Sequence, residues 1–510
     1  MLAINEIELG DDFAAHNNLV TFMAYSCMTS ASEFLSVSFY SSDITGTTYQ
    51  PSEIVLQCKK VFKNIIAYDK FDFDGKKESM YALRPAFDTV ADMIGKGKKV
   101  PESLLEIFAQ NPEYSAKLDS LINAKDKVPF KIFDKKNAEK LFGKNLKISA
   151  SQLEKFNLCR FSYFCNYGLN VRERQRAEIN PMQYGTIVHY ILERFFGEYT
   201  KEEYLSLEED KFQKIVCAYL AEYAVKYFGE EQLESNSFTY RLKTILDNVM
   251  YLMKHIMEEL SQSEFFVADC ELKIGEDIPS YTIVLPDGHK IAVCGSVDRV
   301  DIMQRADITY LRIIDYKTGT KQFKLSDILY GINLQMLLYL HSIEASGGDK
   351  YGEIVPAGIL YMPATVPYIS SDSLKSIDKL PDELNKKLKM NGLLLKDTEI
   401  IHGMDKTDVA TYIPVKIKAG EPVSSTSLAT LAEFGKIFKK VDMLIAEMGK
   451  NIYNGNIEAK PLKGGHDSCE YCPYDSVCAY RQSNPITCFS VDNKTVIEEI
   501  TNEINGKEEE

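Results

Sequence analysis

The sequence of 510 residues lacks the features that mark several large classes of protein. No apolar run is long enough to cross a membrane, and residues 1–6 have neither a basic segment nor a long apolar stretch, so no secretory signal is expected. There is no Gly-x-x-x-x-Gly-Lys-Ser/Thr loop, which excludes ATP hydrolysis of the Walker type by this chain. These absences predict a cytoplasmic protein that makes no membrane contact and has no ATPase site.

The sequence is also short of positive charge. It contains 59 basic and 74 acidic residues, which gives a formal net charge of -15 at pH 7. A surface of that sign does not attract nucleic acid as a whole, so any contact with DNA must be local or shared with a partner. Candidate local contacts are Arg172, Arg174, Arg176, Lys317, Lys321 and Lys324.

The length exceeds what one hydrophobic core usually supports, and 45% hydrophobic content allows substantial burial, so two or three domains are expected. Cysteine occurs eleven times, an odd number, and four of the eleven group as one candidate metal site described below. This pattern argues against a framework of disulfide bonds.

The segment Asp-Tyr-Lys-Thr-Gly at 315–319 is the most informative part of the sequence. It ends an apolar run, and alternation along the predicted strand places Asp315 and Lys317 on one face. Residues 295–301 form a second acidic strand that contains Asp298, and the polar residues 304–307 predict a turn that joins the two strands as a hairpin.

Two carboxylates and a lysine on such a hairpin suit metal-dependent cleavage of phosphodiesters. Hard oxygen ligands hold Mg²⁺, the metal acidifies a water molecule, and the lysine orients or deprotonates that water. An Asp-x-Lys pair alone is also common on solvated strand faces, so further segments must support this interpretation.

Two predicted helices flank the hairpin in the sequence. Residues 185–195 have an apolar stripe at helical spacing, and His189 lies beside it, either as a structural residue or as a metal ligand. In the helix predicted within 331–339, Gln335 and Tyr339 are one turn apart.

The helix with His189, the acidic hairpin and the helix with Gln335 and Tyr339 follow one another along the sequence. In this order they resemble the PD-(D/E)XK nucleases of the RecB type. The resemblance implies an α/β fold of the restriction-endonuclease type, with a mixed central sheet flanked by helices. It implies that Asp298 and Asp315 hold Mg²⁺ or Mn²⁺, that His189 is a further ligand, and that Lys317 is the catalytic amine. Gln335 and Tyr339 are expected to position their helix and to contact substrate phosphate.

Two further acidic residues lie near these segments. Glu271 is either an additional acidic group of the site or a surface residue of a strand. Asp301 lies three residues after Asp298, so it is expected to point to the opposite face as an exposed acid near the turn.

A cysteine group follows the nuclease segments. Cys469, Cys472 and Cys478 lie within ten residues, and Cys159 follows a predicted helix cap at 149–151. Spacing alone favours zinc, with a redox dithiol or coincidence as alternatives. The resemblance to iron–sulfur nucleases instead implies a 4Fe-4S cluster that joins the two ends of the domain. The other cysteines are expected to be buried small hydrophobic residues, with Cys165 and Cys488 as alternative ligands.

Several segments narrow the resemblance to the AddB family, the B subunits of ATP-dependent helicase/deoxyribonucleases. These segments are 51–55, 149–156, 159–164, 356–361 and 389–395. Arg160 departs from the family, which usually has proline there, and the family's subunit is much longer, with a helicase-like region that is expected to be missing here. The resemblance implies a DNA exonuclease subunit of an AddAB/RecBCD-type complex that processes double-strand ends for recombinational repair. Its expected partners are an AddA-like motor subunit, as a heterodimer, and single-stranded ends fed from duplex DNA.

The resulting domain prediction has three parts. Residues 1–145 are expected to be the end of an inactive helicase-like region, and 146–484 the nuclease domain with an insertion at about 365–425. Residues 485–510 are expected to be an acidic, disordered tail. A stand-alone iron–sulfur exonuclease and a non-catalytic interaction module remain alternatives, and so does a truncated or split subunit. Intact Asp298, Asp315 and Lys317 favour a catalytic protein, because a buried acid that has lost its metal destabilises the fold.

Overall fold

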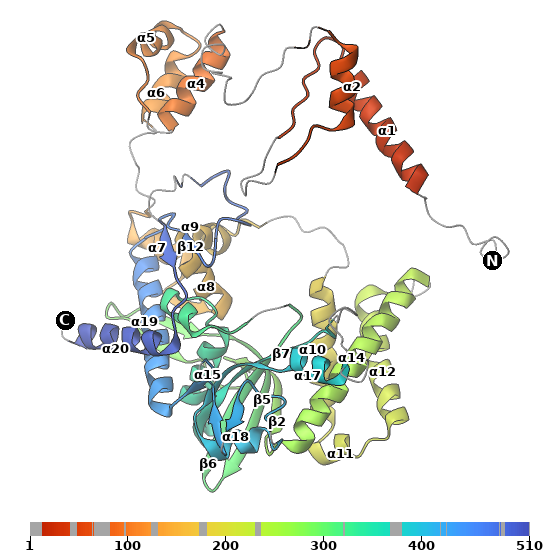
Figure 1. Cartoon of the computed structure of the whole chain (residues 1–510). Helices are drawn as coiled ribbons and strands as arrows, with labels where there is room; N and C mark the ends of the chain where they lie inside the picture. The colour runs from red at the N-terminus through yellow and green to blue at the C-terminus, as the bar shows by residue number, and fades with distance from the viewer. Residues whose placement is uncertain are drawn as a thin grey trace, which may run out of the picture. The chain divides into compact units, whose positions relative to one another are not determined.

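The computed structural model of the chain describes residues 13–40, 48–63, 65, 82–95, 98–123, 131–172, 181–229, 236–319, 322–367, 380–407, 409–418, 420–424, 426–478, 480 and 485–508 (Figure 1). The chain divides into two compact units, Met1–Val128 and Pro129–Glu510. This division comes before the boundary expected at residue 145. The physical reason is that α7 (Lys135–Phe142) packs against α19 (Leu431–Tyr453) and so belongs to the second unit.

The first unit is helical in its described part. Its helices are α1 (Phe13–Thr29), α2 (Glu53–Val61), α4 (Leu83–Gly95), α5 (Glu102–Gln110) and α6 (Ser115–Asn123). A small core forms among the last three helices, where the rings of Phe87, Phe108 and Tyr114 contact one another. α2 has no buried residue, so this unit is stabilised mainly by the core around α4, α5 and α6.

The second unit is built on a mixed sheet of six strands. These are β2 (Phe266–Ile274), β5 (Gly295–Arg305), β6 (Ile308–Lys317), β7 (Glu353–Pro363), β8 (Asn391–Leu395) and β11 (Leu428–Ala429). The strand order is β11-β8-β7-β6-β5-β2. β6 and β7 are parallel, as are β8 and β11, and the other neighbours are antiparallel. The expected mixed sheet flanked by helices is confirmed.

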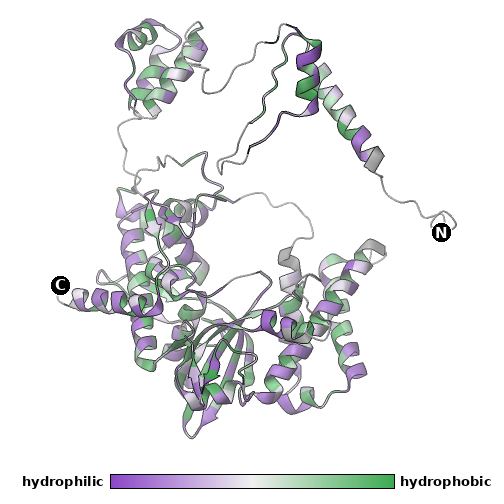
Figure 2. Ribbon diagram, viewed as in Figure 1, coloured by the Kyte–Doolittle hydropathy of each residue, from purple (hydrophilic) through white to green (hydrophobic). Residues whose placement is uncertain are grey.

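The predicted hairpin is the pair β5 and β6. Arg305 pairs with Ile308, and the turn between them uses Ala306 in the left-handed region at φ 51°. Most residues of both strands are buried on both faces, because helices cover both sides of the sheet. Figure 2 shows the hydrophobic residues gathered in these strands.

Helices lie on both sides of the sheet in Figure 1, with α10 (Pro181–Glu198), α12 (Glu209–Phe228) and α14 (Asn236–Gln262) to the right and α15 (Gln335–Ser346) and α19 to the left. The apolar stripe predicted on α10 is buried, with Val188, Ile191 and Phe195 fully inaccessible. α8 (Ala150–Leu158) begins at the predicted cap, where Ser149 and Gln152 form a reciprocal capping box.

Smaller elements complete the second unit. A three-stranded sheet has the order β1-β4-β3, from β1 (Asn145–Ile148), β3 (Thr282–Val284) and β4 (Lys290–Val293). The remaining elements are α9 (Arg160–Tyr163), η2 (Phe164–Gly168), α11 (Lys201–Leu205), η3 (Leu325–Tyr330), α16 (Gly348–Tyr351), α17 (Leu380–Leu388), α18 (Thr398–Met404), β9 (Lys416–Lys418), β10 (Glu421–Val423), β12 (Leu462–Gly464), β13 (Ile486–Cys488) and α20 (Asn493–Glu508).

The prediction of an insertion at about 365–425 was wrong for its central part. β8 lies within it and pairs with β7 inside the sheet, and Leu393 and Leu394 are fully buried. The five-residue strand is short, and polar residues surround it in the sequence, so its apolar pattern is difficult to recognise.

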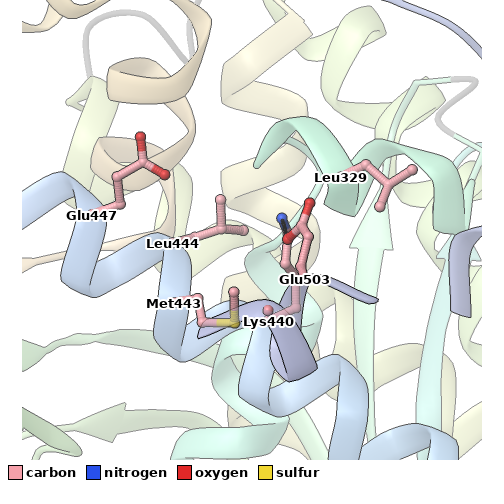
Figure 3. A pocket seen from close by; sticks show the side chains of 7 residues that line it. Leu329, Lys440, Met443, Leu444, Glu447 and Glu503 are labelled. Atoms are coloured by element: carbon pink, nitrogen blue, oxygen red, sulfur yellow. Dashed lines mark hydrogen bonds and ion pairs between the residues drawn. The ribbon is translucent and has the colours of Figure 1, made fainter. Parts of the chain in front are cut away.

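The prediction of a disordered tail was also wrong, since residues 493–508 form α20. Val496 and Ile500 are fully buried, and α20 packs against α19 and η3. Figure 3 shows the pocket beside this contact, where Lys440 of α19 and Glu503 of α20 form an ion pair. The acidic composition of this segment hides the apolar face of α20, so the sequence did not predict a packed helix.

None of the helices among the described residues combines the length and the apolar character that a membrane crossing requires.

Candidate active site

The β5–β6 hairpin brings the predicted acidic residues together. Arg299 pairs with Ile314, so the adjoining residues Asp298 and Asp315 lie across from each other on the two strands. The backbone N–H of Tyr316 donates to Oδ2 of Asp298 at 2.9 Å. Nζ of Lys317 lies 2.5 Å from Oδ2 of Asp315. The shared face that the two-residue spacing predicted is therefore present in the structure.

His189 reaches this hairpin from α10. Its Nε2 lies 3.6 Å from Oδ2 of Asp298, and its Nδ1 lies 3.1 Å from Oε1 of Glu271 on β2. The potential ligand atoms of these three residues all lie within 4.8 Å of one another. One imidazole and two carboxylates from three separate elements thus converge on a volume that a single cation could fill.

Glu271 is part of the group rather than a surface strand residue. Its Oε2 accepts a hydrogen bond from Ser296 at 2.8 Å, and its backbone is left-handed, with φ 50°. A non-glycine residue in this region costs about 1–3 kcal/mol and persists where surrounding structure requires it, often at functional sites. Beyond the presence of an acid on a strand, nothing in the sequence signals this left-handed residue.

The charges of this group alter one another's proton affinity. Burial, reinforced by the neighbouring charge of Asp315, raises the pKa of Asp298 to about 7. Burial alone would lower the pKa of His189, but the hydrogen bond to Glu271 and the charge of Asp298 outweigh it and raise that pKa to about 9. An excess of carboxylate therefore draws protons to the site, and a divalent cation could replace them.

The side chains fit a hard divalent cation. Two carboxylates and one imidazole meet in one volume, with Asp315 across the hairpin from Asp298, and oxygen-rich sets of this kind suit Mg²⁺ or Mn²⁺. Oδ2 of Asp315 is buried, and among the described residues it has no hydrogen bond of normal geometry. Its near neighbour is the Lys317 ammonium, so this oxygen keeps capacity for a further ligand.

Gln335 and Tyr339, the two candidate residues predicted on α15, occupy different environments. Gln335 begins the helix with a half-buried side chain, and its backbone N–H donates to Glu154 at 3.3 Å. Tyr339 is buried, and its hydroxyl packs so closely on Gly295 that a Cβ there would lie 2.2 Å away. The hydroxyl of Tyr339 faces β5, the strand that carries Asp298, and its contact with substrate phosphate stays a prediction. Its position explains why residue 295 is glycine.

The expected exposure of Asp301 was wrong. Instead of an exposed acid near the turn, it is a fully buried residue bound by Arg299 and Arg312. It is on the face opposite Asp298, as its spacing predicted. The alternation of the strand alone does not indicate that two arginines share this buried face.

The cysteine segments lie side by side. Cys159, Cys165 and Tyr474 form one buried cluster, against which Cys472 and Cys478 pack. The hydroxyl of Tyr474 donates to the carbonyl of Val171 at 2.7 Å and so joins segments that are 303 residues apart.

Cys469 lies beside this cluster. Burial raises the pKa of the Cys478 thiol, and the nearby thiols of Cys472 and Cys469 raise it further. Cys488 is elsewhere, packed with Ile332 and Leu462. Among the described residues no three cysteine sulfurs lie within 4.8 Å of one another, whereas four thiolates about 2.3 Å from one zinc ion would lie closer.

Of the predicted basic contacts, Arg172 and Lys324 are exposed, and Lys317 lies in the site. Arg174, Arg176 and Lys321 lie outside the described residues.

The chain is similar to a nuclease superfamily and to proteins named as deoxyribonuclease subunits. A family model described as the PD-(D/E)XK nuclease superfamily matches residues 147–479, more than half of the chain. A protein of Clostridium acetobutylicum, named as the B subunit of an ATP-dependent helicase/deoxyribonuclease, is 31% identical over 505 residues, covering 93% of this chain and 43% of the relative. Proteins of the same name from Clostridium botulinum (strain Loch Maree / Type A3) and Thermoanaerobacter sp. (strain X514) are 33% and 30% identical, over 90% and 94% of this chain and 42% and 43% of their own. The expected resemblance is confirmed, and the chain spans less than half the length of these relatives.

Proposed function

Because the chain belongs to the PD-(D/E)XK nuclease superfamily, we propose that it is a deoxyribonuclease that hydrolyses phosphodiester bonds with Mg²⁺ or Mn²⁺. Nucleases of this superfamily generally use a divalent metal. The observation that supports the proposal most is the convergence of His189, Glu271 and Asp298, with the Asp315–Lys317 pair on the adjoining strand. This arrangement unites ligands of a hard cation with an amine within reach of the same volume.

The proposed roles follow from position. Asp298, Asp315 and His189 hold the metal, and Glu271 is either a fourth ligand or the group that orients His189 through its Nδ1. When bound, the metal supplies an acidified water and offsets charge on the phosphate. Lys317, beside Asp315, orients that water or accepts its proton, and Gln335 and Tyr339 of α15 are the candidates for phosphate contact.

We further propose that Cys159, Cys469, Cys472 and Cys478 hold a 4Fe-4S cluster. The contact between the two cysteine segments supports a shared metal site, and the resemblance to iron–sulfur nucleases favours a cluster over a single zinc ion, the other candidate. Cys469 follows Cys159 by 310 positions, so the cluster would close a very long loop and restrain the unfolded chain. Its proposed role is structural.

The names of the relatives support a place in a larger assembly. We propose that the chain acts as the exonuclease of an AddAB-type complex, with an AddA-like motor subunit that supplies single-stranded ends. The negative net charge agrees with shared DNA binding, because a partner can provide the positive surface that this chain lacks. Residues 1–128 are proposed to be the end of a helicase-like region that guides DNA or docks the partner.

The proposal is tested with end-labelled single-stranded DNA in Mg²⁺, in Mn²⁺ and in EDTA. The wild type should degrade the DNA in either metal and not in EDTA. Asp298→Ala and Asp315→Ala should lose about 10³-fold in rate, which corresponds to the several kcal/mol that a metal contributes to the transition state. Asp269→Ala, which removes a carboxylate paired with Lys350, is the matched control and should keep its activity. Undiminished cleavage by Asp315→Ala would overturn the proposal.

A further inference from the structure

A fully buried group of four charged side chains lies behind the candidate site. Glu259 on α14, Arg299 and Asp301 on β5, and Arg312 on β6 are all inaccessible to solvent. Arg299 donates through Nε and Nη2 to both oxygens of Asp301 at 2.6 Å and through Nη2 to Glu259 at 3.0 Å. Arg312 donates to Glu259 at 2.5 Å and to Asp301 at 3.0 Å. We call these four residues the ion-pair cluster.

The ion-pair cluster is neutral as a whole and closely bonded, but its burial is costly. Removing charges from water costs several kcal/mol per ion, and well-packed apolar residues would often stabilise a fold equally well. Stability alone therefore explains the cluster poorly. Its other property is rigidity, because multiple bonds fix α14, β5 and β6 relative to one another.

The ion-pair cluster and the candidate site lie on opposite faces of the same two strands. Arg299 directly follows Asp298, and Tyr316 lies between Asp315 and Lys317. Side chains alternate along a strand, so Arg299 and Tyr316 point toward the cluster while their neighbours point toward the site.

Tyr316 connects the two faces. Its hydroxyl accepts a hydrogen bond from Nη1 of Arg299 at 3.4 Å. Its backbone N–H donates to Oδ2 of Asp298 at 2.9 Å. Its ring forms a T-shaped contact with the imidazole of His189, with centroids 5.8 Å apart. One residue therefore touches the ion-pair cluster and two of the candidate metal-binding side chains.

We propose that Tyr316 is a positioning residue, which transfers the rigidity of the ion-pair cluster to Asp298 and His189. This inference rests on the proposed metal site. The hydroxyl anchors the phenol to Arg299, the fixed phenol sets the orientation of its own peptide, and the peptide N–H fixes one oxygen of Asp298. Outer partners of this kind hold ligands in the geometry that a metal needs, and their loss typically weakens metal binding by about 10- to 100-fold.

The test compares Tyr316→Phe with Tyr351→Phe. Each substitution removes one buried hydroxyl, but the hydroxyl of Tyr351 donates to Asp269 at 2.6 Å, and Tyr351 lies near the opposite end of β6, where its carbonyl accepts from Thr309. Mn²⁺ affinity is measured by calorimetry on the full chain without DNA, and thermal unfolding is recorded in EDTA. Tyr316→Phe should weaken Mn²⁺ binding about tenfold, whereas Tyr351→Phe should lower thermal stability without changing Mn²⁺ affinity.

Equal Mn²⁺ affinities for wild type and Tyr316→Phe would overturn the inference, as would a wild type that binds no Mn²⁺. The same tenfold loss in Tyr351→Phe would also overturn it, because the effect would then reflect general loosening. Failure of the proposed function is separate. A wild type that binds Mn²⁺ but cleaves no DNA removes the nuclease proposal, while the ratio of Mn²⁺ affinities still decides the role of Tyr316.

Discussion

Nζ of Lys317 lies 2.5 Å from Oδ2 of Asp315, two residues before it on the same strand. The register of the hairpin places Asp298 across from Asp315, and His189 reaches Asp298 from α10. The amine is therefore held at the edge of a group of acids rather than in open solvent. This relationship links the chemistry proposed for the site to a simple property of strands, the alternation of side chains.

Metal affinity should depend steeply on pH. Asp298 has its pKa raised to about 7 and His189 to about 9, so each binds a proton below its pKa that a metal must displace. Mg²⁺ affinity should therefore rise from pH 6 to pH 9, by up to about tenfold for each unit in which one proton is released. Calorimetry in buffers of different ionisation enthalpy measures both the affinity and the released protons.

His189→Ala provides the comparison for that experiment. It should bind Mg²⁺ more weakly, and its pH dependence should follow Asp298 alone, with a pKa that the imidazolium charge no longer lowers. An affinity that is constant from pH 6 to pH 9 in the wild type would contradict the assigned ligands.

Breaking the ion-pair cluster should destabilise the second unit strongly. Asp301→Asn leaves two buried arginines with one carboxylate, and removal of one partner from a buried pair costs roughly 3–5 kcal/mol. Urea unfolding measures this loss. Glu276→Gln removes an exposed partner of Lys273 and should change the free energy of unfolding by less than about 1 kcal/mol. Similar small losses in both variants would show that the cluster is solvated.

The thiol site should give a visible signal. The purified protein should be brown and contain about four iron ions per chain, and Cys472→Ala should lose both colour and thermal stability. Cys488→Ala is the control, since Cys488 packs with Ile332 and Leu462 away from the other thiols. Colourless protein with stoichiometric zinc would contradict the iron–sulfur assignment and leave the nuclease proposal intact.

Helix α20 should contribute to stability despite its acidic sequence. Ile500 is fully buried, so Ile500→Ala should lower the free energy of unfolding by roughly 2–5 kcal/mol. Glu499→Ala alters the exposed neighbour and should have little effect. If urea unfolding does not distinguish the two variants, the helix does not pack as described.

The local features of the site were predictable because they depend on short-range rules. Alternation placed Asp315 beside Lys317, helical spacing buried the stripe around His189, and the Ser149–Gln152 box marked the start of α8. The hairpin followed from a polar turn between two apolar runs. Each of these features is fixed by residues fewer than about ten positions apart.

The features that the sequence did not settle depend on contacts between distant segments. Asp301 is buried because Glu259, 42 positions earlier, completes a neutral group with two arginines. The sequence left Glu271 open between the site and a surface position, and its contacts with His189 and Ser296 place it at the site. The hydroxyl of Tyr339 packs on Gly295, and α20, which carries the buried Ile500, packs against α19 and η3. Periodicity and composition do not describe such pairings.

The most direct test of the catalytic assignment compares the wild type with Lys317→Ala on end-labelled single-stranded DNA in Mg²⁺, alone and with the cognate motor subunit. Lys350→Ala, which removes a lysine paired with Asp269, is the control. We predict that Lys317→Ala binds Mg²⁺ and DNA but cleaves at least about 100-fold more slowly in both settings, because a positioned group for proton transfer is lost. Equal cleavage by wild type and Lys317→Ala in both settings would contradict the assignment, and a non-catalytic interaction module would then replace it.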